Sequence, residues 1–221
     1  VLVLPAFMAA VFAWGVAHAL GTLPADLTLG IGALAAVLAV ALYVCTGMIY
    51  ACLPFLQEWH SPLTVLNFAL LGGASGFTLA AGFAGFAAPA LVPFFGVAAL
   101  VLLLFAFAGR GAALVRNARI RPRSTLQTAI GIKHPRIVQI SAGFQGGSFN
   151  TREFFHGRTR ELLRAVRWGF LVAVFALPAL LLAAGLWGGW PAALPIAFAV
   201  QYAGLLAERW YFFAEARHPQ N

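Results

Sequence analysis

Apolar residues fill six long runs of this chain, and most of the turns between them are short and polar. The runs cover residues 1–23, 27–53, 63–86, 89–109, 168–186 and 191–213. Each is close to the ~20 residues that cross ~30 Å of hydrocarbon as a helix. The pattern therefore predicts an all-α fold, a polytopic membrane helix bundle with six transmembrane helices. Pro178 lies inside the fifth run, where it predicts a kink.

One polar segment, residues 110–167, is much longer than the other turns. It divides the chain into four transmembrane helices (1–109), a basic loop (110–167), and two more transmembrane helices with a C-terminal tail (168–221). The loop is the largest surface outside the membrane in this sequence. We therefore expect it to be the place where a soluble partner docks.

The loop is expected to contain short helices. Ser124 with Gln127, and Asn150 with Glu153, have the spacing of helix capping boxes. Each pair predicts a helix start, and Gly131 is expected to end the first of these helices.

Composition supports a membrane protein, and in a membrane protein the position of the positive charges indicates topology. Hydrophobic residues make up 62% of the chain, charged residues 9%, and the mean hydropathy is +0.89. Soluble domains are about half apolar and a quarter charged. The net charge is +8, and all of the 14 Lys and Arg residues except Arg209 and Arg217 lie in the basic loop. Such a concentration indicates a topology signal and argues against nucleic-acid binding.

The basic loop also predicts the orientation, because short cytoplasmic loops carry the excess of Lys and Arg. With the loop in the cytoplasm, the start of the chain, the turn at residues 57–61 and the C-terminal tail are cytoplasmic too. The turns near Asp26, Gly85 and Gly188 then face outward, and they contain no Lys or Arg.

Few residues in the apolar runs could carry chemistry. Cys45 and Cys52 are too far apart along one helix for a disulfide. His18 has no second histidine at matching depth in another run, so no haem is expected. The sequence shows no metal-ligand cluster and no nucleophile with a base at motif spacing. We therefore expect no metal site and no catalytic residue.

Two groups of residues near the cytoplasmic ends of the runs are candidates for quinone binding. Tyr50, Trp59 and His60 combine aromatic rings with a donor, and a quinone reaction moves protons. Glu208 and Arg209 lie in the last run, where ionisable residues are functional candidates. The alternatives are an interfacial aromatic belt for the first group and an ion pair reaching the membrane surface for the second.

Several segments resemble the dimethyl sulfoxide reductase anchor subunit family. They are residues 43–52 (YVCTGMIYAC), 58–64 (EWHSPLT), 121–131 (RPRSTLQTAIG), 147–154 (GSFNTREF) and 207–218 (AERWYFFAEARH). The resemblance covers the whole chain. The last segment is the most specific.

The resemblance implies that these helices are the third to eighth of an eight-helix anchor. Its partners would be an iron–sulfur subunit and a catalytic subunit with molybdopterin, and those cofactors would lie in the partners only. The anchor would exchange electrons with menaquinone or ubiquinone, without haem. The family's main quinone motif would precede residue 1. Candidates for partner docking are Arg121, Arg123, Arg152 and Glu153.

The resemblance also implies a bacterial inner-membrane location and leaves two activities open. The arginine-rich loop favours relatives that oxidise sulfite in the cytoplasm, with the periplasmic reduction of dimethyl sulfoxide as the alternative. A passive anchor without quinone chemistry is a third possibility. A transporter is a distant alternative, because it needs helix breaks in corresponding positions of two halves. Gly72 and Gly73 interrupt the third run, and the fifth and sixth runs contain no matching break.

Overall fold

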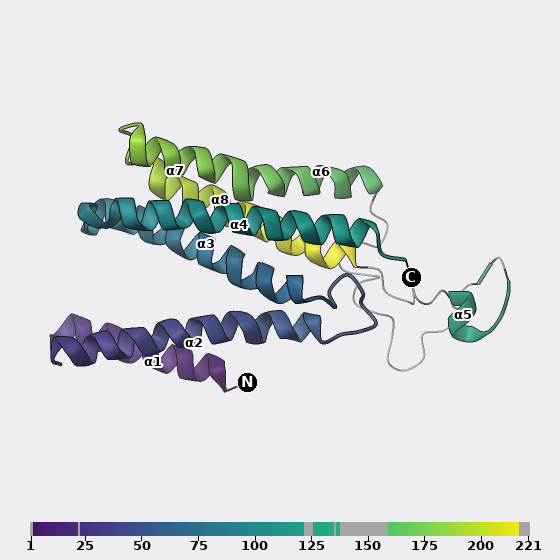
Figure 1. Cartoon of the computed structure of the whole chain (residues 1–221), viewed down its shortest axis with the longest axis horizontal. Helices are drawn as coiled ribbons and strands as arrows, with labels where there is room; N and C mark the ends of the chain where they lie inside the picture. The colour runs from purple at the N-terminus through teal and green to yellow at the C-terminus, as the bar shows by residue number, and fades with distance from the viewer. Residues whose placement is uncertain (1, 22, 122–125, 135, 138–158, 217–221) are drawn as a thin grey trace.

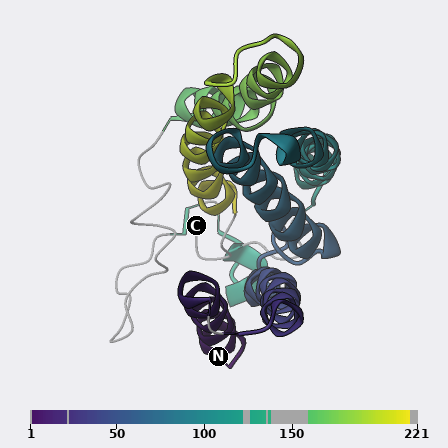
Figure 2. The same cartoon turned by 90° about the vertical axis from the view of Figure 1, so that its left-hand side faces the viewer.

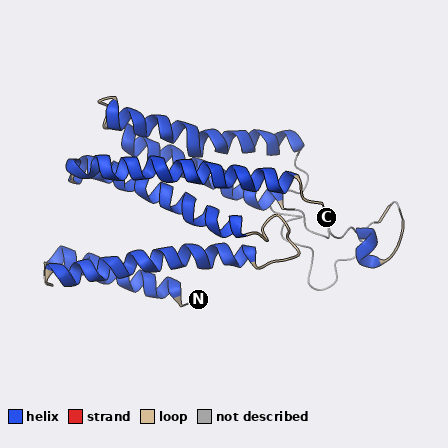
Figure 3. Cartoon of the chain, in the orientation of Figure 1, coloured by secondary structure: helices blue, strands red, loops and turns tan. Residues whose placement is uncertain are grey.

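The computed structural model describes residues 2–21, 23–121, 126–134, 136–137 and 159–216. Its long helices are α1 (Val3–Leu20), α2 (Ala25–Ala51), α3 (Pro62–Ala87), α4 (Val92–Ala118), α6 (Arg160–Leu171), α7 (Leu177–Trp187) and α8 (Ala193–Glu215). Shorter elements are the 3₁₀ turn η1 (Pro89–Leu91), helix α5 (Leu126–Ile130) and the π turn η3 (Val172–Ala176). The described part of the chain has helices and no strand (Figure 3). The predicted all-α fold is confirmed.

Within the residues that the structure describes, five segments are long and apolar enough to cross a membrane. They are Val3–Leu20, Ala25–Ala51, Pro62–Ala87, Pro89–Ala118 and Arg160–Trp187. Helix α8 has 23 residues, enough for ~30 Å of hydrocarbon, but its polar residues lower its hydropathy. Two of these, Gln201 and Glu208, have no exposed surface, so α8 turns them into the bundle. The chain is therefore a multi-pass membrane bundle, with α8 as its most polar member.

The helices form two groups. Helices α3, α4, α8 and the continuous α6–η3–α7 segment pack together, whereas the α1–α2 pair joins them through α2 and α3 (Figures 1 and 2). Small residues allow the close approaches. A Cβ on Gly204 of α8 would lie 2.8 Å from the carbonyl carbon of Ala173 in η3. Small residues at such contacts are typical of membrane helices, where close van der Waals packing drives association.

Several local signals explain where helices begin and end. Ser61 caps α3 by accepting a hydrogen bond from the Leu63 N–H, and Pro62 occupies the first turn. Pro178 has no N–H to donate to the preceding turn, and the π turn η3 precedes it. The kink predicted at Pro178 stays a prediction. Helix α5 ends before Gly131, whose φ is 71°, as predicted.

The helices extend into both ends of the segment that the sequence assigned to the basic loop. Helix α4 continues to Ala118, so Arg110 and Arg116 are helical residues. Helix α6 begins at Arg160, with Thr159 as its cap. The assignment of Arg110 to a loop was wrong, because residues 112–118 contain no Gly or Pro and are mostly good helix formers (Ala, Leu and Arg), so the helix of the fourth apolar run continues through them.

The turns alternate between the two ends of the bundle. The beginning of α1, the α2–α3 link, the ends of α4 and α8 and the beginning of α6 lie at one end (Figure 1). We call this the basic end. These segments were expected to share one side of the membrane, because successive spans alternate in direction, and the structure agrees. That this end faces the cytoplasm, as the charge pattern indicates, stays a prediction.

Candidate functional site

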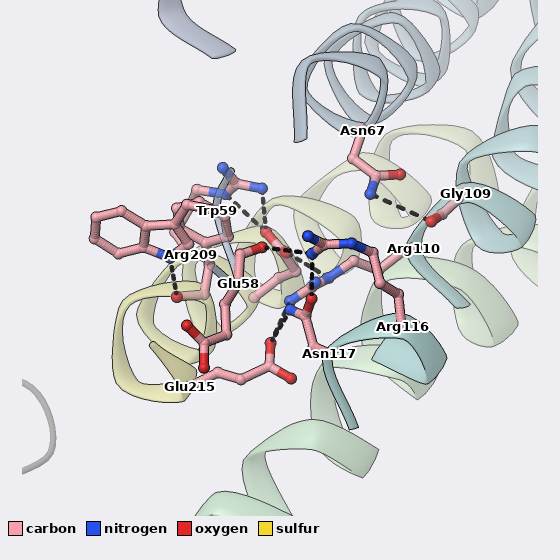
Figure 4. Close-up of polar contacts among 11 residues, drawn as sticks. Glu58, Trp59, Asn67, Gly109, Arg110, Arg116, Asn117, Arg209 and Glu215 are labelled. Carbon is pink, nitrogen blue, oxygen red and sulfur yellow. Dashed lines mark hydrogen bonds and ion pairs between the residues drawn. The ribbon is translucent and has the colours of Figure 1, made fainter. Parts of the chain in front are cut away.

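A cluster of charged side chains is buried inside the basic end of the bundle. Glu208 of α8 has no exposed side-chain surface and lies between Arg110 and Arg209. Figure 4 labels these two arginines and Glu215. Its Oε1 is 2.8 Å from Nε of Arg110 in α4, which is 3% exposed. Arg209 donates from Nε to Oε2 of Glu208 at 2.7 Å. Glu215 completes the set, with Oε2 3.9 Å from Nη2 of Arg110. We call these four residues the ion cluster.

The ion cluster brings together charges of both signs, as burial requires. A buried charge without a partner is strongly unfavourable, whereas two carboxylates and two guanidiniums compensate one another. Aromatic rings cover the rest of the guanidinium surfaces. The Arg209 guanidinium lies 4.2 Å from the ring centroid of Phe68, and that of Arg110 lies 5.5 Å from Phe170 and 5.9 Å from Tyr211. The cluster therefore joins α3, α4, α6 and α8.

Aromatic side chains from four segments pack beside the ion cluster. Trp59 of the α2–α3 link is 2% exposed and stacks on Phe212 of α8 at 5.1 Å. Its Nε1–H donates to the Phe212 carbonyl oxygen at 3.0 Å. Tyr50 of α2 contacts Trp59 edge-on at 5.3 Å and stacks on Phe68 of α3 at 5.6 Å. These rings fix the α2–α3 link against α8.

Arg116 near the end of α4 holds the α2–α3 link by donating hydrogen bonds to backbone carbonyl oxygens of the link. Nη2 donates to the carbonyl oxygens of Gln57 at 2.9 Å and His60 at 3.1 Å. Nη1 donates to the Glu58 carbonyl at 3.4 Å and to Oδ1 of Asn117 at 3.0 Å. A planar guanidinium can satisfy several acceptors at once, so one side chain fixes the whole turn.

His60 is one of the residues that line a groove between α2 and α3. The groove has a volume of about 580 Å³ and a lining that is almost entirely apolar. Val44 and Met48 of α2 face Val65 and Leu66 of α3 across it. His60 is exposed, and its Nδ1 lies 2.6 Å from the Ala51 carbonyl oxygen. Because a carbonyl only accepts, Nδ1 carries the proton of the neutral ring, and Nε2 is left as an acceptor.

The structure thus separates the five residues predicted for quinone binding. Tyr50, Trp59, Glu208 and Arg209 come together in a packed core of rings and charges. His60 lies beside the groove instead. The quinone-binding role of all five stays a prediction.

The partner-docking candidates are described only in part. Arg121 is exposed, just beyond the end of α4. Arg123, Arg152 and Glu153 lie outside the described residues. Among the residues that are described, no group of three or more His, Cys, Asp and Glu side chains could hold a metal ion.

Sequence reasoning missed two residues of this region. Arg110 and Arg116 were counted with the loop, yet one is a central member of the ion cluster and the other fixes the α2–α3 link. Both lie on the same helix as the apolar run before them. The lack of a strong helix breaker between Gly111 and Arg119 was the available signal.

Apolar helices, a buried ion cluster and a basic end define an integral membrane protein of the all-helical, multi-pass class. The comparison with known proteins gives its family. The chain is 53% identical to a sulfite dehydrogenase subunit of Allochromatium vinosum, over 231 aligned positions that cover all of this chain and 71% of that protein. The chain therefore belongs to a family of sulfite dehydrogenase subunits. No family model and no solved structure matches it. The wider resemblance to dimethyl sulfoxide reductase anchors stays a prediction.

Proposed function

We propose that this chain is the membrane anchor subunit of a molybdopterin and iron–sulfur oxidoreductase that oxidises sulfite in the cytoplasm. In this role it passes electrons from an iron–sulfur subunit to menaquinone or ubiquinone in the bacterial inner membrane. The observation that carries the proposal is the 53% identity over the whole chain to a protein named as a sulfite dehydrogenase subunit.

The arrangement of the bundle supports this function. The exposed Arg121, the α2–α3 link and the groove all lie at the basic end. An iron–sulfur partner with an acidic face would be attracted to that end. A quinone reaches the same end through the lipid, so both redox partners would meet at one membrane surface. The iron–sulfur clusters and molybdopterin would be held by the partner subunits.

The first test is purification of the tagged chain from its native membranes in mild detergent. We expect an iron–sulfur subunit and a molybdenum subunit to copurify, and sulfite to reduce a soluble quinone analogue in the purified complex. A salt wash should release the soluble subunits, since exposed charge pairs are screened. A chain that purifies without redox subunits would contradict the proposal.

A second test addresses orientation, in a variant with Cys45 and Cys52 replaced by serine. A cysteine at Ile132, which is exposed beyond α5, reports on the basic end. A cysteine at Ala25, exposed at the start of α2, is the matched control at the opposite end. In intact cells an impermeant maleimide should label Ala25→Cys and spare Ile132→Cys. The reverse pattern would place the docking end in the periplasm and contradict cytoplasmic sulfite oxidation.

A further inference from the structure

The groove between α2 and α3 runs along the two helices. Its lining residues lie between Val44 and Ala51 on α2 and between Pro62 and Ala69 on α3. Seven residues of helical rise correspond to about 10 Å along each axis. Both helices are long and apolar enough to span the membrane, so the groove leads from the membrane interior to the surface where α2 ends and α3 begins. It therefore has the direction of an acyl chain in the surrounding bilayer.

The part of the groove inside the membrane has aliphatic walls. Met48 of α2 and Leu66 of α3 line it, and each is 47% exposed. The two backbones nearly touch beside the groove, because a Cβ on Gly47 would lie 2.8 Å from the Cα of Val65. An alkyl chain needs no hydrogen bond from such walls. Because lipid tails are as apolar as the walls, the chain gains only packing there, and the headgroup decides which lipid is preferred.

Polar groups and a cation gather where the groove reaches the membrane surface. His60 and Ser61 line this end. The Arg116 guanidinium lies next to it, since its Nη2 donates to the His60 carbonyl oxygen at 3.1 Å. Arg116 is in none of the ion pairs that join described residues, so carbonyl oxygens and Asn117 surround its charge. Helix α3 also begins here, and the positive end of its dipole adds to the same field.

The neighbouring segments add further positive charge. Arg119 and Arg121 are exposed just beyond Arg116, at the end of α4. The α2–α3 link contributes one carboxylate, that of Glu58. Basic sites between membrane helices bind anionic lipid headgroups, and each arginine near the surface strengthens the attraction by a factor of about five. The excess of three arginines over one carboxylate therefore favours an anionic headgroup at this end of the groove.

We propose that this groove is a binding site for an anionic phospholipid. One acyl chain lies between α2 and α3, and the phosphate lies at the end lined by His60 and Ser61, beside Arg116. The α1–α2 pair joins the other helices through α2 and α3, so a lipid along this seam adds packing where the bundle has least. The site does not depend on a redox role for the chain or on which side of the membrane the basic end faces.

The test uses the protein purified from its native membranes, with any subunits that remain bound, in lipid nanodiscs. The probe is phosphatidylglycerol with a photoreactive diazirine in one acyl chain, and labelled peptides are mapped by mass spectrometry. Unlabelled phosphatidylglycerol and phosphatidylcholine are compared as competitors. Met48→Trp and Ala69→Leu fill the groove from its two walls. Ile49→Trp is the matched control, since Ile49 is 62% exposed on the same helix turn and does not line the groove.

We expect the label to concentrate in residues 44–51 and 62–69. Phosphatidylglycerol should displace it at a concentration about fivefold or more below that of phosphatidylcholine, the factor that one arginine contributes near an anionic headgroup. Met48→Trp and Ala69→Leu should each lower the labelling, whereas Ile49→Trp should match the wild type.

A pair of variants at His60 tests the headgroup end separately. His60→Glu places a negative charge beside the phosphate and should abolish the preference for phosphatidylglycerol. His60→Gln has nearly the same shape without the charge and should keep the preference.

Three outcomes would overturn the proposal. Labelling spread evenly over the exposed faces of α1 and α2, or equal labelling of Met48→Trp and Ile49→Trp, would show only the lipid that surrounds any membrane protein. Equal competition by the two phospholipids would show that the end lined by His60 does not select an anionic headgroup. A groove that is labelled only after bound subunits are stripped away would be covered by another polypeptide.

Discussion

Replacing Glu208 with glutamine should destabilise the bundle strongly. Glu208 is fully buried and is the partner of both Arg110 and Arg209. Once its charge is removed, the nearest carboxylate to the buried Arg110 is that of Glu215, at 3.9 Å. Arg209 is 29% exposed, so water and the Phe68 ring compensate it in part. The cost therefore comes mainly from Arg110.

The expected loss of stability follows from the buried charge of Arg110 that is left without its close partner. Removing one partner of a buried ion pair costs about 3–5 kcal/mol. For a chain of this length, 1 kcal/mol corresponds to about 2–4 °C in the unfolding midpoint, so Glu208→Gln should lower the midpoint by about 6–20 °C. The assay is thermal unfolding in dodecylmaltoside, followed by the tryptophan fluorescence to which the buried Trp59 contributes. Glu161→Gln, the same change at an exposed position of α6, is the control and should leave the midpoint nearly unchanged.

Two further variants test whether the instability of Glu208→Gln comes from leaving the Arg110 charge buried without its partner. Arg110→Met alone should be milder than Glu208→Gln, because Glu208 keeps its contacts with Arg209 at 2.6–2.7 Å. The double variant Arg110→Met/Glu208→Leu should be more stable than Glu208→Gln, since apolar groups can replace a buried pair at little cost. If Glu208→Gln unfolds within about 2 °C of the control, or if the double variant shows the sum of both single losses, the ion cluster does not stabilise the bundle as described.

Three further predictions concern the packing around the α2–α3 link. Trp59→Phe removes the Nε1–H that donates to the Phe212 carbonyl oxygen and should cost about 0.5–1.5 kcal/mol in thermal unfolding; an unchanged midpoint would mean that this hydrogen bond does not stabilise the bundle. Gly47→Ala pushes a methyl group against the Val65 backbone and should cost about 1–3 kcal/mol, whereas Gly15→Ala, with open space around it, should not destabilise. Arg116→Ala releases three carbonyls, so amides of the link should exchange hydrogen about tenfold faster or more, and equal exchange would refute the clamp.

The sequence predicted the helices well because their signals are local. Hydrophobic runs near the length of a membrane span marked the helices, and their ends were set by nearby Gly and Pro residues. Gly131 marked the end of α5, since a residue with positive φ ends the helical turn that precedes it. The alternation of the apolar runs predicted which segments share one end of the bundle. The end of α4 was misplaced, because the Arg residues there were interpreted as a loop.

The tertiary structure decided the partners of the polar residues. The sequence identified Glu208 and Arg209 as unusual, but it gave no sign that Arg110 of α4 would lie 2.8 Å from Glu208. Nor did it separate the buried Trp59 from its exposed neighbour His60. The physical reason is that each helix has its hydrogen bonds within its own backbone, whereas a contact between helices depends on their rotation and crossing. The rotation and crossing of the helices are set by close packing between small residues of different helices. These contacts exist only in the folded chain.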